Sequence, residues 1–183
     1  MAKQMHFSVE ARTAATPAAV YALLADGASW LRWAPFTGFE LEREGEAGGE
    51  SAGAIRVFTS RLITNREELT GLAQDRQISY RSLSGMPIRN HAATVRLTPA
   101  DGGTLITWDE QFEATRPGTG WYLTRALRRF VQKCADGLAI ATLAGRVLVL
   151  SRAQHTSFVS TRDMLRRLAT TQSRILGAVL NHF

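Results

Sequence analysis

A glutamate lies among large apolar side chains near residue 110. The segment 105–114 alternates in polarity, which is typical of a strand with one buried face. The residues on its apolar face are Ile106, Trp108, Glu110 and Phe112. A carboxylate in such surroundings must find a polar partner, reach water or have its pKa raised. Glu110 is therefore the first candidate for general acid or general base chemistry.

Histidine, arginine and tyrosine side chains can lie near this carboxylate. The turn residues between segments 91–98 and 105–114 strongly favour a hairpin, so the two strands should pair. Alternation along the first of these strands then places His91 and Arg89 on the same face as Glu110. Tyr80 belongs to the apolar face of an earlier strand. His91 is a candidate catalytic residue, and Arg89 and Tyr80 are candidates to orient the carboxylate or contact a ligand. The alternative for His91 is a histidine that only completes the wall of the fold.

Glu67 is a further acidic candidate for the inner face. It shares parity with Leu69, and Arg56 can face it across the connecting hairpin. The parity of Arg56 is ambiguous, because its neighbours Ile55 and Val57 make the opposite face equally apolar. The pair is therefore either a polar element of a cavity or a cross-strand surface pair that contributes little to stability.

Aromatic and aliphatic residues supply the remaining candidate ligand contacts. Trp33 and Phe36 belong to a short apolar cluster before the main strands, and we expect them near a cavity mouth. The other candidates are Trp108 and Phe112 in the last strand and Leu127 and Phe130 on the helix that follows. Ordinary core packing is the alternative for Trp108, Phe112 and Phe130, because every curved sheet needs a filled interior.

Metal and nucleotide motifs are missing from the sequence. The one cysteine, Cys134, lies on an apolar helix stripe, and the four histidines lack the close spacing of metal ligands. The glycine-rich turns lack the context of a phosphate loop. We therefore expect no metal and no other cofactor. No zinc-finger spacing or other nucleic-acid motif is present either, so we expect no nucleic-acid partner.

These residues need a set of elements to position them. The predicted strands are 6–13, 39–43, 54–59, 62–70, 77–83, 91–98 and 105–114. A short helix is predicted after Thr16 and Pro17, which suit an N-cap and a first helical turn. A long amphipathic helix, with apolar residues from Leu123 to Ala141 on one face, ends the order. This order predicts an α+β fold in which a curved antiparallel sheet of about seven strands wraps around the long helix.

Composition and charge indicate to which broad class of protein the chain belongs. The chain has 183 residues, 45% of them hydrophobic, which suits one core. The single cysteine and the absence of a signal-like amino end predict a cytoplasmic protein, and no apolar run is long enough to span a bilayer. The net charge is +6, but residues 121–183 hold 10 basic and 2 acidic side chains. A solvated basic helix face is the simplest explanation, with an anionic partner as the alternative.

Several short segments, in this order, carry a family resemblance. They are Ala15-Thr-Pro-Ala-Ala-Val-Tyr-Ala-Leu-Leu-Ala-Asp26, Trp30 with Trp33, Gly53-Ala-Ile-Arg56, Arg66-Glu-Glu-Leu69, Ile78-Ser-Tyr80 and Gly85-Met-Pro-Ile-Arg-Asn-His91. With them the chain resembles the SRPBCC, or START-like, superfamily over about residues 5–146, particularly its polyketide cyclase/dehydrase and lipid-transport proteins. The resemblance implies a helix-grip domain at 1–146 with a cavity for a hydrophobic molecule. It implies no single chemistry.

The residues after this domain depart from the family pattern. Ser160 and Asp163 resemble a helix-capping box, and an apolar stripe runs from Met164 to Leu180 with arginines beside it. We predict a helical extension at 147–183. It could pack on the domain, form a homodimer or lie on an anionic membrane surface, and we prefer these options in that order.

Three functions are compatible with these observations. The first is binding or transport of a small lipid-, polyketide- or isoprenoid-like ligand in an internal cavity. The second is a cyclase, dehydratase or hydrolase reaction on such a ligand, with Glu110 as acid or base. The third is an interaction module that works through the basic tail. The apolar face with few polar groups favours the first.

Overall fold

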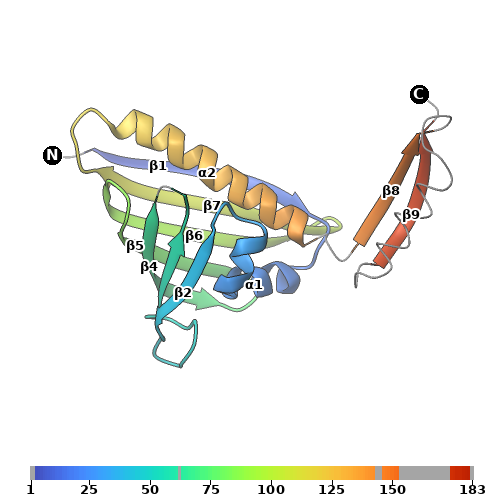
Figure 1. Cartoon of the computed structure of the whole chain (residues 1–183), viewed down its shortest axis with the longest axis horizontal. Coiled ribbons are helices and arrows are strands. Elements are labelled where there is room, and N and C mark those ends of the chain that lie inside the picture. Colours follow the sequence, from blue (N-terminus) through green and yellow to red (C-terminus); the bar gives the residue numbers. More distant parts are fainter. Residues whose placement is uncertain (1–2, 62, 143–145, 153–173, 182–183) are drawn as a thin grey trace. The chain divides into compact units, whose positions relative to one another are not determined.

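The computed structural model describes residues 3–61, 63–142, 146–152 and 174–181, the last two ranges by their backbone alone. The chain forms two compact units, Met1–Thr142 and Leu143–Phe183 (Figure 1). The candidate site residues all belong to the first unit. Among the described residues, no helix combines the length and the apolar character needed to cross a bilayer.

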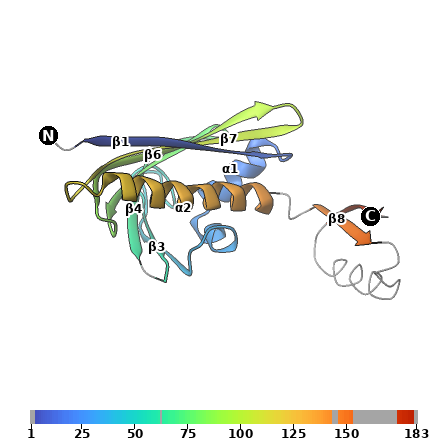
Figure 2. The same ribbon diagram turned by 90° about the horizontal axis from the view of Figure 1, so that it is seen from above.

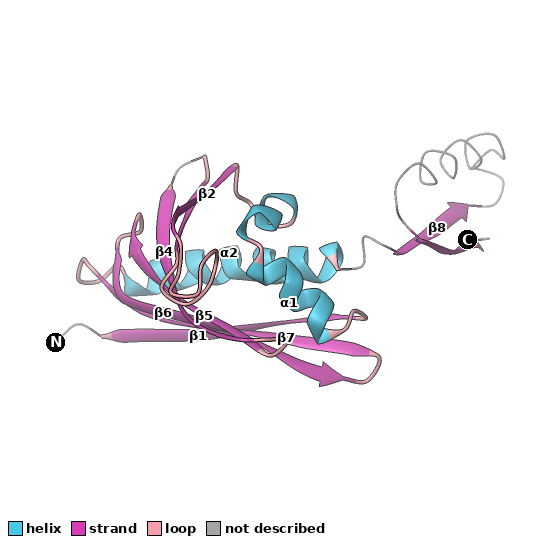
Figure 3. Cartoon of the chain, turned by 90° about the horizontal axis from the view of Figure 1, so that it is seen from below, coloured by secondary structure: helices cyan, strands magenta, loops and turns pink. Residues whose placement is uncertain are grey.

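A seven-stranded antiparallel sheet forms the frame of the first unit. Its strands are β1 (Gln4–Thr13), β2 (Gly38–Arg43), β3 (Ile55–Thr59), β4 (Thr64–Ala73), β5 (Gln77–Ser84), β6 (Ile88–Ala100) and β7 (Gly103–Ala114). The strand order is β1-β7-β6-β5-β4-β3-β2, so each strand from β2 onwards pairs with the next in sequence and β1 closes on β7. All seven predicted strands are present. The sheet curves, and Figure 3 shows the helices of this unit together on one side of it.

Two short helical segments follow β1. Helix α1 (Pro17–Ala25) begins at the N-cap Thr16, whose hydroxyl accepts from the Ala19 backbone N–H, as its sequence predicted. The 3₁₀ helix η1 (Gly27–Arg32) begins at Asp26, whose carboxylate caps Ser29. These caps place Trp30 in the core, where it is almost fully buried.

The long helix α2 (Gly120–Ala141) lies across the concave face, beside β1 (Figure 2). The residues that it buries against the sheet are Val131, Cys134, Ala135, Leu138 and Ala139. Gly137 allows its last turns to approach η1 closely, because a Cβ there would lie 2.0 Å from the Trp33 carbonyl oxygen. The predicted arrangement, a curved sheet around one long helix, is confirmed.

The pairing of β6 with β7 sets which side chains point inward. Val95 faces Trp108 and Ala93 faces Glu110 in the ladder. The register shifts between Arg89 and Ala92, and Asn90 has a positive φ of 50°. This bulge reverses the alternation that the sequence predicted for the start of β6. A shared inner face for Arg89 and His91 is therefore wrong, and the Arg89 side chain is exposed on the other face.

The second unit contains two parallel strands, β8 (Arg146–Arg152) and β9 (Arg174–Asn181). Residues 174–181 thus form a strand, where the apolar stripe predicted a helix. The stripe contains Gly177, which disfavours a helix, together with the β-branched Ile175 and Val179, and the Val147–Leu150 run supplies a strand with which it pairs. The predicted helix start at Ser160 lies outside the described residues.

Candidate ligand-binding cavity

A cavity of about 210 Å³ lies between the concave face of the sheet and the first half of α2. Its apolar lining comes from Trp30, Phe36, Ile63, Met86, Pro87, Ile88, Trp108, Leu123, Ala126, Leu127, Phe130, Val131 and Cys134. Its polar lining comes from Ser60, Asn65, Glu67, Tyr80, His91 and Glu110. An apolar space with a few convergent polar groups is the usual character of a small-molecule site.

Glu110 of β7 and His91 of β6 form a buried pair at this cavity. Glu110 Oε2 lies 2.6 Å from His91 Nε2, and each side chain is 3% exposed. The Ser82 backbone N–H donates to His91 Nδ1 at 2.9 Å. Because an amide N–H can only donate, Nδ1 carries no proton, and the ring is the neutral tautomer with its proton on Nε2. His91 therefore donates to Glu110.

Tyr80 of β5 supplies a second donor to the same carboxylate. Its hydroxyl lies 3.4 Å from Glu110 Oε1 and accepts the Trp108 indole N–H at 3.0 Å. Burial raises the pKa of the Tyr80 phenol well above its ordinary value, and the nearby carboxylate of Glu110 raises it further. Tyr80 is thus held in its protonated, donating form.

Arg56 of β3 and Glu67 of β4 form a second buried pair, directly opposite each other in the ladder. Arg56 Nη2 lies 2.7 Å and Nε 3.2 Å from Glu67 Oε1. The guanidinium is fully buried, lies 5.1 Å from the Trp30 ring centre, and also donates to Glu50 and to the Leu24 carbonyl oxygen. The ambiguous parity of Arg56 is resolved: its side chain points inward, and the pair is not a surface pair.

The electrostatics of Glu67 combine two opposing effects. Burial raises the pKa of this carboxyl above its ordinary value, and Arg56 partly offsets the rise. The other carboxylate oxygen accepts from the Asn65 amide at 3.2 Å. Both carboxylate oxygens of Glu67 therefore accept hydrogen bonds from other side chains of the protein.

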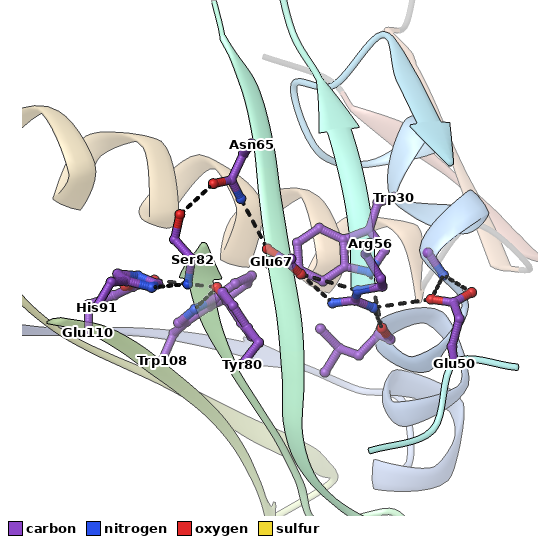
Figure 4. Close-up of polar contacts among 12 residues, drawn as sticks. Trp30, Glu50, Arg56, Asn65, Glu67, Tyr80, Ser82, His91, Trp108 and Glu110 are labelled. Atoms are coloured by element: carbon purple, nitrogen blue, oxygen red, sulfur yellow. Dashed lines mark hydrogen bonds and ion pairs between the residues drawn. The ribbon is translucent and has the colours of Figure 1, made fainter. Parts of the chain in front are cut away.

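A polar track joins the two pairs across the concave face (Figure 4). The Ser82 hydroxyl donates to Asn65 Oδ1 at 2.8 Å, and Asn65 in turn donates to Glu67. Because the Ser82 backbone also holds His91, one short segment of β5 positions both acidic groups. The track lies beneath a ligand space that is otherwise apolar.

Most of the predicted contact residues line the cavity. These are Phe36, Glu67, Tyr80, His91, Trp108, Glu110, Leu127 and Phe130. Trp33 is buried beside Trp30, with ring centres 4.5 Å apart, and Phe112 is buried in the core, but neither lines the cavity. Arg89 is also outside it and pairs with Glu113 at 3.1 Å.

Other lining residues were missed in the sequence. Leu123 and Cys134 share the helical spacing of Leu127 and Phe130, so the same stripe could have identified them. Burial raises the pKa of the Cys134 thiol, which keeps it protonated and therefore a poor nucleophile. The loop residues around Ser60 and Met86 carry no periodic signal, because their place at the cavity depends on how the hairpins close.

The described residues contain no group of three or more His, Cys, Asp or Glu side chains arranged to hold a metal ion. Their polar groups instead satisfy one another: no buried side-chain nitrogen or oxygen in this part of the chain lacks a hydrogen-bond partner. The arrangement can therefore accept or transfer protons and can bind an apolar molecule with a polar group.

Comparisons with known proteins agree with this architecture. Among solved structures, Ara h 8.0201 is 15% identical, with a TM-score of 0.63, and the match covers 77% of this chain and 99% of that one. The Zhui aromatase/cyclase from a Streptomyces species is 16% identical, with a TM-score of 0.63 and coverage of 76% and 94%. A START superfamily protein from Mycobacterium smegmatis is 16% identical, with a TM-score of 0.63 and coverage of 76% and 96%. These similarities show a shared helix-grip, START-like fold.

Sequence comparison identifies the family. No curated protein matches the chain. A family model described as polyketide cyclase / dehydrase and lipid transport matches residues 4–141, which is most of the chain and nearly all of the first unit. The chain therefore belongs to the polyketide cyclase / dehydrase and lipid transport family.

Proposed function

We propose that the protein binds a small, mainly apolar molecule in the cavity beneath α2. The observation that carries this proposal is a cavity of about 210 Å³ whose lining is mostly aromatic and aliphatic, with the buried Glu110 at its wall. Burial of a ligand's apolar surface there contributes roughly 25 cal/mol per Å². The names of the family and of the aromatase/cyclase neighbour are compatible with lipid-, polyketide- or isoprenoid-like molecules.

Binding can be measured with the neutral fluorescent probe N-phenyl-1-naphthylamine. We expect saturable fluorescence enhancement with the full chain, and native mass spectrometry of the protein as purified should detect a co-purifying small molecule. Ala126→Trp adds a ring at the cavity lining and should weaken probe binding at least about tenfold. Arg125→Trp is the matched control, because Arg125 is the adjacent exposed residue of the same helix and does not line the cavity. No probe uptake, with equal behaviour of both variants, would contradict the proposal.

A second candidate function is acid–base catalysis on the bound molecule. The observation that favours it is the 2.6 Å contact between His91 and Glu110 in a nearly water-free wall of the cavity. A desolvated carboxylate that accepts from a neutral imidazole can remove a proton from a bound substrate. On a molecule that the protein turns over, Glu110→Gln should lower kcat about 100-fold or more. Unchanged kcat would exclude Glu110 as the acid or base.

A further inference from the structure

The hydrogen bonds around Glu110 all run in one direction. The Ser82 N–H donates to His91, which in its neutral form donates to Glu110 Oε2. The Trp108 N–H is donated to the Tyr80 oxygen, which leaves the Tyr80 proton free to be donated to Glu110 Oε1. Glu110 is thus the acceptor at which two chains of donors end, an arrangement that suits a carboxylate.

The acceptor capacity of Glu110 is only partly used. An ionised carboxylate offers about four lone-pair sites. Two receive donors from the protein, and one of those bonds, from Tyr80, is long at 3.4 Å. Glu110 lines the cavity and its side chain is 3% exposed, so a molecule in the cavity meets only a small edge of this carboxylate, in surroundings with little bulk water.

No cation among the described residues pairs with Glu110. Its one ion-pair contact in this part of the chain is His91, which the Ser82 N–H holds neutral. The nearest buried cation along the polar track, Arg56, is already engaged by Glu67, Glu50 and a backbone carbonyl. A second anion beside Glu110 would therefore meet uncompensated repulsion in a space of low dielectric.

We infer that the ligand presents a hydrogen-bond donor, a hydroxyl or a protonated amine, to Glu110 and keeps the rest of its body apolar. The inference rests on the proposed binding function and narrows its ligand class. Molecules of the same shape that end in a carboxylate are rejected. Glu110 thereby selects the orientation of the ligand, with the donor end at β7 and the apolar body against Phe36, Leu127 and Phe130.

Three matched probes test the inference: naphthalene, 2-naphthol and 2-naphthoate. Their binding to the full chain is measured by calorimetry or by fluorescence at constant pH and salt. We expect 2-naphthol to bind at least about tenfold more tightly than 2-naphthoate, because one gains a charge-assisted hydrogen bond and the other faces a like charge. Naphthalene should bind with intermediate affinity.

Two variants locate the effect. In Glu110→Gln the neutral amide can both donate and accept, so the preference for 2-naphthol over 2-naphthoate should fall to about threefold or less. Glu113→Gln changes the same residue type on the other face of β7 and should leave the preference unchanged. Equal affinities of the wild-type protein for 2-naphthol and 2-naphthoate would overturn this inference but not the binding function. Failure of all three probes to bind would count against both.

Discussion

Glu67 and Glu110 lie on the same concave face and are equally buried, at 3% exposure, yet their surroundings differ. Glu67 receives a guanidinium on one oxygen and an amide on the other, and its cation in turn holds the α1–η1 segment through Leu24. Glu110 receives only neutral donors, one of them distant. The difference indicates that burial of a carboxylate does not by itself mark a functional group. What matters is how much of its acceptor capacity the protein leaves for a ligand.

Removal of the cation from Glu67 should give the largest effect. Arg56→Leu leaves a fully desolvated carboxylate without its main partner, and we expect a loss of about 3–5 kcal/mol in the free energy of unfolding. Urea denaturation followed by circular dichroism measures this loss. The double variant Arg56→Leu/Glu67→Leu should lose less than the single variant, because no unpaired charge remains. A loss below about 1 kcal/mol for Arg56→Leu would mean that the pair is not structural.

The titration of Glu67 should also make the free energy of unfolding depend on pH. Because burial raises its pKa, the folded chain binds a proton at Glu67 more readily than the unfolded chain does. The free energy of unfolding should therefore decrease as the pH rises from the ordinary glutamate value, about 4.3, through the raised pKa, and then level off. Comparison with the Arg56→Leu/Glu67→Leu variant isolates this contribution. Parallel pH profiles for the two proteins would contradict it.

Neutralising Glu110 should cost much less than breaking the Arg56 pair. In Glu110→Gln the amide oxygen can still accept from His91, the amide N–H can donate to the Tyr80 oxygen, and a buried charge without a cationic partner disappears, so we expect a change of about 1 kcal/mol or less in either direction. Thermal and urea unfolding measure it. A loss as large as that of Arg56→Leu would show that Glu110, too, is chiefly structural.

Removal of an exposed ion pair on the outer face should give the smallest change in the free energy of unfolding. Arg81 and Glu68 lie 2.6 Å apart on β5 and β4, but the arginine side chain is more than half exposed. Arg81→Ala should change the free energy of unfolding by about 0.5 kcal/mol or less, and 0.5 M salt should reduce that change. A larger, salt-independent loss would mean that the outer pairs share the structural role of Arg56 and Glu67.

Local patterns in the sequence determined most of the fold. The period-two alternation and the turn residues located all seven strands, and the helical stripe with Leu127 and Phe130 located α2. Alternation depends only on neighbouring residues, so it also placed Glu110 and Tyr80 on the inner face before any pairing was known. In the second unit the same reasoning predicted a helix for residues 174–181, which form β9. The apolar pattern of that segment is compatible with either a helix or a strand.

Alternation along each strand predicted which side chains could share the concave face, but the folded structure was needed to show which of them meet. The bulge before His91 turned Arg89 outward, and the ladder brought Arg56 inward against Glu67. The direction of the bonds to Glu110 depends on the Ser82 backbone, nine residues from the histidine that it holds. Such contacts depend on strand register and loop closure between distant segments, and periodicity along one strand carries no information about either.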